Sequence, residues 1–563
     1  MKNQLLSLLA VALVAGSLLE CSAKEDAPVL VPGNKPVAII SFASYDRLMA
    51  DLALIGDMAG MEDLDKNIEG AIELFTQGQG LTGLDKTRPF GIILATDGTQ
   101  FQPLFVLPVT NLKLLLESLA GLLGDAVDAG DGLLELSIFD QKIVVKEKNG
   151  YAFMAAAPEA LVDLPQDPAK LFGGLDKSYD IGARLYLQNL PQEYRSLLVD
   201  SLRGGVEAGL ARQPDETDEA YDARKKLVTD QIDSISATIS EFDQLTLGVG
   251  LDTKARSARA ELVMTALPNT DSGKMMSQIK AAPSAFAGFL LPDAAASLNI
   301  SAKVGKESAG LIAGAFQSFR GTIFERIDAE ARLPNPASKK LAKELINELL
   351  DAMQTTLGTG KIDVGAVLTL SDHSLALAAG AYISDPKALE ESLKRFAKST
   401  ADDKDIPGIK FNAETYAGVQ FHTTQLPVPQ DGPVAKALGE KLDVAFGIGP
   451  KSVYLALGAD GLKLCKTAID RSKSDAGKPA PPMRVNVALA PIFKFAAALS
   501  DQPNLTAQAD DLAKASGKDQ VHVTVSPEGL TTTIRIEAQE GVLKMLGSAF
   551  QQAGGLEGLL PGN

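Results

Sequence analysis

Residues 90–119 read FGIILATDGTQFQPLFVLPVTNLKLLLESL, and residues 364–393 read VGAVLTLSDHSLALAAGAYISDPKALEESL. Each stretch has an apolar run, a polar turn and a second apolar run, which is the pattern of a β-hairpin. Asn111 or Asp385 then opens a helix, because such side chains accept hydrogen bonds from the free N–H groups of a first helical turn. The shared pattern predicts one strand–turn–strand–helix module that is used twice.

Further pairs of segments correspond in the same order along the chain. They are residues 37–42 with 296–300, 142–164 with 443–465, 183–191 with 484–491, and 243–247 with 519–523. Collinear order favours an internal duplication over independent α/β patterning. We therefore predict a first repeat at residues 36–285, a second repeat at residues 293–552 and a C-terminal tail at residues 553–563.

The hairpins also predict the fold class. Residues 521–525 (VHVTV) alternate apolar and polar side chains, which is typical of an antiparallel strand with one solvated face. Helices are expected between hairpins rather than between single strands, so a parallel sheet is disfavoured. The prediction is an α+β fold with two tandem related halves, each a curved, mostly antiparallel sheet with helices packed on one face.

The N-terminus has the pattern of an export signal. Residues 5–19 are uncharged and apolar; such a stretch matches a signal-peptide core and is short of the roughly 20 residues that span a bilayer. Small side chains before the cleavage point predict residues 1–23 as a signal peptide cleaved after Ala23. The alternatives are lipidation of Cys21, although Glu20 is unlike the small residue usual before a lipidated cysteine, and a retained anchor.

These features predict an exported protein, periplasmic or extracellular, or anchored to the membrane as a lipoprotein. Residues 24–35 are expected to form a flexible tether. No later stretch has 18 uncharged apolar residues in a row, so no membrane span is expected after signal removal. The chain carries 71 acidic against 54 basic residues, a net charge of −17, which argues against nucleic acid as a partner.

The sequence names no catalytic, cofactor-binding or metal-ligating residue. Residues 78–83 match GxGxxG but follow an expected helix and precede an expected strand, so they indicate a helix exit rather than a dinucleotide loop. Cys465 has no partner once the leader is removed or lipidated, and is expected in the core. The three histidines, His373, His422 and His522, share no local ligand spacing and are expected to be exposed or half-buried.

The leader and the repeated layout resemble those of uncharacterised exported bacterial proteins with a signal peptide and duplicated strand–helix modules, a resemblance that implies no activity. Our first hypothesis is a non-catalytic envelope protein that binds a small molecule, a lipid or a protein. The apolar helix at residues 112–123 either lines a groove for such a ligand or belongs to the core. The alternatives are a structural or interaction protein of the cell surface and a hydrolase whose site is assembled from distant residues.

Overall fold

The computed structural model describes residues 34–552, except for residues 62, 139–140, 211, 213–217, 330–335, 372–373, 400, 402–406, 429–434, 436–437, 475–476, 479, 500–502 and 515–517. The predicted signal peptide, with Cys21 and Ala23, lies outside the described residues. So do most of the tether and the predicted C-terminal tail.

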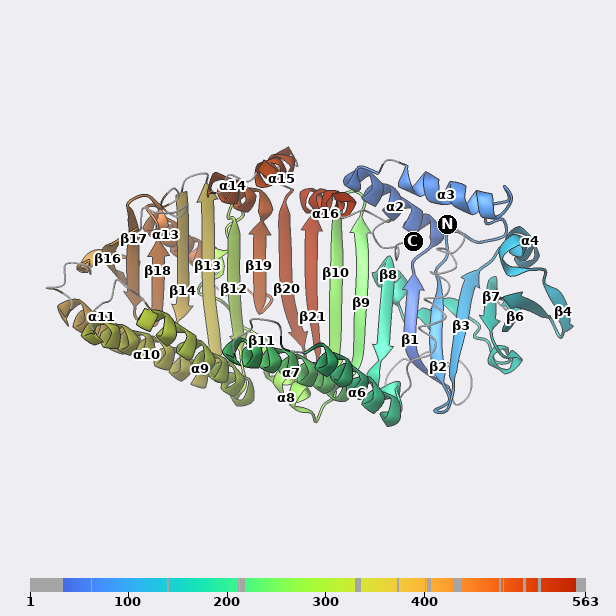
Figure 1. The fold of residues 1–563 in the computed structure, drawn as a ribbon, viewed down its shortest axis with the longest axis horizontal. Coiled ribbons are helices and arrows are strands. Elements are labelled where there is room, and N and C mark those ends of the chain that lie inside the picture. The colour runs from blue at the N-terminus through green and yellow to red at the C-terminus, as the bar shows by residue number, and fades with distance from the viewer. Residues whose placement is uncertain are drawn as a thin grey trace. The chain divides into compact units, whose positions relative to one another are not determined.

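The chain divides into two compact units, Met1–Gly273 and Lys274–Asn563. The first unit is built on an antiparallel sheet (Figure 1). Its strands are β1 (Lys35–Phe42), β2 (Phe90–Thr96), β3 (Phe101–Pro108), β4 (Val127–Gly130), β5 (Leu133–Ile138), β6 (Gln141–Lys148), β7 (Tyr151–Ala155), β8 (Ile181–Tyr186), β9 (Phe242–Asp252) and β10 (Ser257–Ala266). Within the unit their order across the sheet is β10-β9-β8-β1-β2-β3-β7-β6-β5-β4, and every described pairing is antiparallel.

Helices of the first unit connect these strands. They are α2 (Tyr45–Ala59), α3 (Leu64–Phe75), α4 (Leu112–Leu123), η2 (Pro158–Leu161), η3 (Pro168–Phe172), α5 (Leu175–Ser178), η4 (Leu187–Asn189), α6 (Gln192–Gly209) and α7 (Asp218–Glu241), followed by α8 (Asp271–Gln278) at the division between the units. The Asn111 side chain accepts a hydrogen bond from the Leu114 N–H and caps α4, as the sequence predicted.

Both faces of the first sheet are covered. Side chains alternate between the faces of a strand, and the neighbours Val144 and Val145 of β6 belong to different apolar clusters. Val144 packs with Phe172 of η3, whereas Val145 packs with Leu115 of α4. The expectation of helices on one face is therefore wrong for this unit.

The second unit has its own antiparallel strands. They are β11 (Lys280–Ala281), β12 (Ala296–Lys303), β13 (Lys361–Ser371), β14 (Ser374–Tyr382), β15 (Lys410–Tyr416), β16 (Val419–Pro427), β17 (Lys441–Gly449), β18 (Ser452–Leu457), β19 (Met483–Ala488), β20 (Gln520–Glu528) and β21 (Thr531–Gln539). Within the unit the order is β21-β20-β19-β12-β13-β14-β18-β17-β16-β15, and the short β11 pairs with the end of β12. The predicted mixed class, with an extensive antiparallel sheet and helices, is confirmed.

Helices also cover both faces of the second sheet. They are η5 (Ala287–Phe289), α9 (Lys306–Ala329), α10 (Pro336–Gly358), α11 (Lys387–Ser399), α13 (Gly461–Ser474), α14 (Leu489–Leu499), α15 (Pro503–Lys514) and α16 (Glu540–Gln552). On β17, Ala445 packs with Cys465 of α13, whereas Phe446 points to the other face, toward α10 and α11. Figure 1 shows α9, α10 and α11 running across the strands of this unit.

The GxGxxG segment lies where a helix ends, as predicted. Helix α3 ends at Phe75, and Gly78, Gly80 and Gly83 all have positive φ angles, between 59° and 94°. Glycine adopts this left-handed region without the steric cost that a side chain would add. The strand β2 follows, so the order is helix, turn, strand, and a dinucleotide loop requires the opposite order.

Candidate functional site

An apolar groove of about 290 Å³ lies between two helices and the sheet of the second unit. It is lined by Leu345, Ile346 and Leu349 of α10, Leu389 and Leu393 of α11, Val364 of β13, Ala379, Gly380 and Ala381 of β14, Phe446 and Ile448 of β17, and Val453, Tyr454 and Leu455 of β18. The side chains that point into the groove are apolar, since Tyr454 points to the opposite face of the sheet, where its ring packs with Phe286, Phe289 and Phe421. Such a surface favours an apolar ligand, because it offers few hydrogen bonds to a polar one.

The sequence of α11 explains one wall of this groove. Leu389 and Leu393 are four residues apart, so they lie on one helical face, and both are buried. Glu390 and Lys394 form an ion pair of 2.6 Å beside them. Across the groove the strands carry small side chains, Ala379 and Ala381, which leave space between helix and sheet. The sequence analysis did not identify this site, although the amphipathic spacing of α11 was a readable signal.

A buried histidine lies next to the groove. His422 of β16 pairs in register with Phe446, which lines the groove, and its side chain is fully buried. Its Nδ1 accepts a hydrogen bond of 3.0 Å from the Asn412 N–H, and its ring lies 5.1 Å from that of Phe411. Burial lowers the pKa of His422, so the ring is neutral at pH 7. The sequence expectation of exposed or half-buried histidines is wrong here.

The other two histidines give different outcomes. His522 is half-buried, as expected, and its Nδ1 lies 2.8 Å from the Asn486 side-chain oxygen. His373 lies outside the described residues. In the described part of the chain, no group of three or more His, Cys, Asp or Glu side chains is arranged to hold a metal ion.

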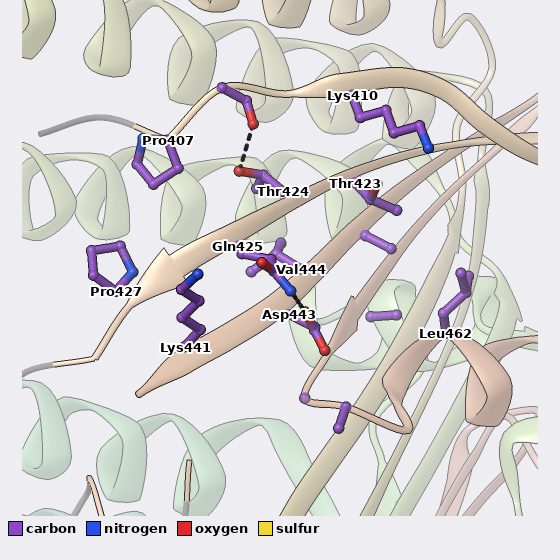
Figure 2. Close-up of a pocket in the computed structure, with 15 residues that line it drawn as sticks. Pro407, Lys410, Thr423, Thr424, Gln425, Pro427, Lys441, Asp443, Val444 and Leu462 are labelled. Carbon is purple, nitrogen blue, oxygen red and sulfur yellow. Dashed lines mark hydrogen bonds between the residues drawn. The ribbon is translucent and has the colours of Figure 1, made fainter. Parts of the chain in front are cut away.

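A second, more polar pocket of about 810 Å³ lies at the other end of the same strands (Figure 2). Its polar lining residues are Lys410, Thr423, Thr424, Gln425, Lys441 and Asp443. Figure 2 shows the Gln425 amide donating to the Asp443 carboxylate at 2.8 Å, and the Thr424 hydroxyl donating to the Gly408 carbonyl at 3.1 Å. The described residues of this lining include no histidine or cysteine, so among them there is no nucleophile–base pair of the usual hydrolase kind.

A buried serine–aspartate contact has the residue types of a hydrolase centre and joins the segment before η5 to β13. The Ser284 hydroxyl donates to Asp363 at 2.6 Å and accepts hydrogen bonds from the Asn299 side chain and the Phe286 N–H. Asp363 also pairs with Lys361 at 3.1 Å. A hydroxyl with all of its hydrogen-bonding capacity in use is not poised for attack. We assign this network to anchoring the segment before η5 against β13.

A pair of buried carboxyl groups lies in the first unit. Asp180 accepts from Arg47 Nε at 2.8 Å and from the Leu251 N–H at 2.6 Å. Asp51 is buried nearby on α2, and its Oδ1 has no hydrogen-bond partner in the described residues. Burial, together with the charge of Asp180, raises the pKa of Asp51 to about 7. The Asp180 carboxylate joins Arg47 of α2 to the backbone of β9, so we treat the cluster as a structural contact between α2 and β9.

Cys465 lies in the core, as predicted. Its side chain is fully buried on α13, it forms no disulfide, and burial raises the pKa of its thiol to about 12. A thiol that stays protonated in this way is a poor nucleophile. The helix at residues 112–123, for which the sequence left a groove lining or the core open, packs Leu112, Leu115 and Leu116 into an apolar cluster, which agrees with the core alternative.

None of the helices in the described ranges combines the length and apolar character that crossing a bilayer requires. No known protein family, characterised protein or solved structure matches this chain.

Proposed function

We propose that this chain is an exported, non-catalytic binding protein whose second unit holds a single acyl chain in the groove between α10, α11 and the sheet. The observation that carries the proposal is the lining of the groove, which comes from six elements and is apolar almost throughout. An apolar chain is driven into such a site because its surface leaves water. No activation of the ligand is needed, so the role is binding rather than catalysis.

The size of the groove supports an acyl chain over a larger ligand. Sites for small molecules usually enclose about 300–1,000 Å³, and this groove, at about 290 Å³, lies at the lower limit. A narrow, unbranched chain fits that space better than a polycyclic molecule or a protein helix. The neutral His422 beside Phe446 adds no charge next to the groove, which is also favourable for an apolar ligand.

The protein acts outside the cytoplasm in this proposal, in the periplasm or the extracellular space. Support comes from residues 1–23, whose apolar core and small-residue cleavage point match a signal peptide. A lipid anchor at Cys21 is the alternative form of the mature protein. In either form a sheltered groove keeps an acyl chain soluble in an aqueous compartment.

The proposal also includes a tandem duplication of one fold. When the short β11 is left out and strands are counted in chain order, the two units have the same strand order across their sheets. The aligned residues also pair alike: Leu104 pairs with Ala155 in the first unit, and the aligned Ala378 pairs with Ala456 in the second. Independent evolution of two sheets rarely reproduces both order and register.

Ligand titration tests the proposed function. We expect the purified mature protein to bind a fluorescent fatty acid, cis-parinaric acid, saturably and with one site per chain. Ala379 faces the groove, so Ala379→Leu fills part of it and is expected to weaken binding about tenfold, equivalent to about 1.4 kcal/mol. The matched control is Ala255→Leu, which adds the same side chain at an exposed turn of the first unit.

Two results would contradict the proposed function. One is the absence of saturable binding to the wild-type protein. The other is an equal loss of affinity in Ala379→Leu and Ala255→Leu, because that pattern indicates binding to exposed apolar surface rather than to the groove. Thermal unfolding of each variant shows whether the fold is retained.

A further inference from the structure

Two lysines that line the polar pocket lie on one face of the sheet. Lys410 pairs with Thr423, which in turn pairs with Ala445, and Pro427 pairs with Lys441. Directly paired residues point to the same face, and residues two apart on one strand share that face. Lys410 and Lys441 therefore project on the same side, from the strands that flank β16. Figure 2 shows them at different ends of the pocket.

Within the described part of the lining, the charges of these lysines are not matched by carboxylates. There neither ammonium group forms an ion pair, whereas the one acidic residue, Asp443, is held by the Gln425 amide at 2.8 Å. The described lining residues thus carry two positive charges against one negative charge. This local excess stands out in a chain whose net charge is −17. An anion is the ligand that such a lining attracts.

The spacing of the lysines indicates the shape of that anion. Their register positions on β16, Thr423 and Pro427, are four residues apart, which corresponds to about 13 Å along the strand. The two strands that carry them lie about 10 Å apart across β16. Figure 2 places the two ammonium groups at different ends of the pocket, where the two ends of one elongated molecule can contact both. The Thr423 hydroxyl lies in the same lining and can donate a further hydrogen bond.

We propose that this pocket binds an elongated organic molecule with an anionic group at each end. The volume of about 810 Å³ lies within the usual range for small-molecule sites. Carboxylate and phosphate groups share the chemistry that lysine recognises, since its ammonium acts as a compact point charge. The site is separate from the apolar groove, and the inference does not rest on the function proposed there.

Isothermal titration of the mature protein at low salt tests the inference, with two sets of probes. One set is the dicarboxylates from succinate to azelate, and the other is fructose 1,6-bisphosphate beside inorganic phosphate. We expect affinity to rise with the length of the dicarboxylate, and the bisphosphate to bind more tightly than inorganic phosphate. The set that binds more tightly distinguishes a carboxylate ligand from a phosphate ligand.

Substitutions locate the site. Lys410→Gln and Lys441→Gln are each expected to weaken binding of the best probe about three- to tenfold, since each removes one charged contact. The matched control is Lys451→Gln, an exposed lysine in the turn between β17 and β18, outside the pocket lining. Its affinity is expected to equal that of the wild type.

The inference is overturned if no probe binds the wild-type protein, if succinate and azelate bind equally, or if Lys451→Gln weakens binding as much as the two pocket variants. The last outcome would indicate general attraction to surface lysines. Circular dichroism of each variant shows that lost binding does not come from lost structure.

Discussion

Among single residues, Asp51 shows most clearly how burial changes chemistry. The residue is 5 % exposed, and one carboxyl oxygen lacks a hydrogen-bond partner in the described residues. Ionising such a group costs free energy, because little water reaches it to stabilise the charge. The Arg47 guanidinium, 3.6 Å from Asp51 Oδ1, offsets only part of this cost, since it also pairs with Asp180. In the folded protein, Asp51 therefore stays protonated at pH values well above those at which an aspartate usually ionises.

We predict that Asp51→Asn flattens the pH dependence of stability. An aspartate in an unfolded chain has a pKa of about 3.9, whereas the pKa of folded Asp51 is about 7. Between these values the unfolded state loses its proton and the folded state keeps it, so the free energy of unfolding falls as pH rises. When the pH rises from 4 to 8, the free energy of unfolding of the variant should increase by about 2–4 kcal/mol relative to that of the wild type.

Urea unfolding at pH 4, 6 and 8 measures this difference. The control is Asp222→Asn, an exposed aspartate of α7, whose stability curve should run parallel to that of the wild type. Parallel curves for Asp51→Asn and the wild type would contradict the assigned pKa of Asp51.

Among the elements, the strands carry glycines where apolar side chains press against the sheet. A Cβ added at Gly365 of β13 would lie 2.8 Å from the Phe286 Cβ and 2.9 Å from the Phe289 Cβ. One added at Gly91 of β2, the aligned position, would lie 2.1 Å from the Ile40 carbonyl oxygen and 2.9 Å from the Phe172 ring. Each aromatic side chain fills the space that glycine leaves. At each position, the close packing of the aromatic segment on the strand therefore requires a residue without a side chain.

We predict that Gly91→Ala and Gly365→Ala each destabilise the protein by about 1–3 kcal/mol, because the added methyl group overpacks a closed contact. The control is Gly314→Ala, at an exposed position of α9 where an added Cβ meets no atom within 4 Å. That control should be neutral or slightly stabilising, since alanine is the better helix former. Thermal unfolding of the three variants measures the difference, and unchanged stability of Gly365→Ala would contradict the packing described here.

The order of hairpins and helices was largely readable from the sequence. Residues 90–119 form β2, β3 and α4, and residues 364–393 form β13, β14 and the first part of α11, as their patterns predicted. The covering of both sheet faces was missed, although β2 (FGIILAT) is nearly continuously apolar rather than alternating. A continuous apolar run is typical of a strand buried on both sides. The alternation of residues 521–525 indicates one solvated face only for the strand in which it occurs.

At the scale of the whole molecule, the sequence predicts which residue is the first of the mature chain. We predict that the exported protein begins at Lys24, because cleavage after Ala23 satisfies the small-residue requirement of the signal peptidase. Intact mass spectrometry of the protein from the cell envelope tests this prediction. The mass of a chain beginning with a lipidated Cys21 would contradict it and would establish a lipid anchor instead.

The sequence by itself determined the local elements, the class of fold and the core position of Cys465, because each depends on residue patterns within a short stretch. Only the tertiary structure decided the groove and the polar pocket. Leu389 and Phe446 line the groove together, and Lys410 and Lys441 line the pocket, through strand order and register that join residues distant in the chain. A periodic pattern indicates that a side chain is buried or exposed. It does not indicate which distant side chain lies opposite, because that depends on the pairing of whole strands.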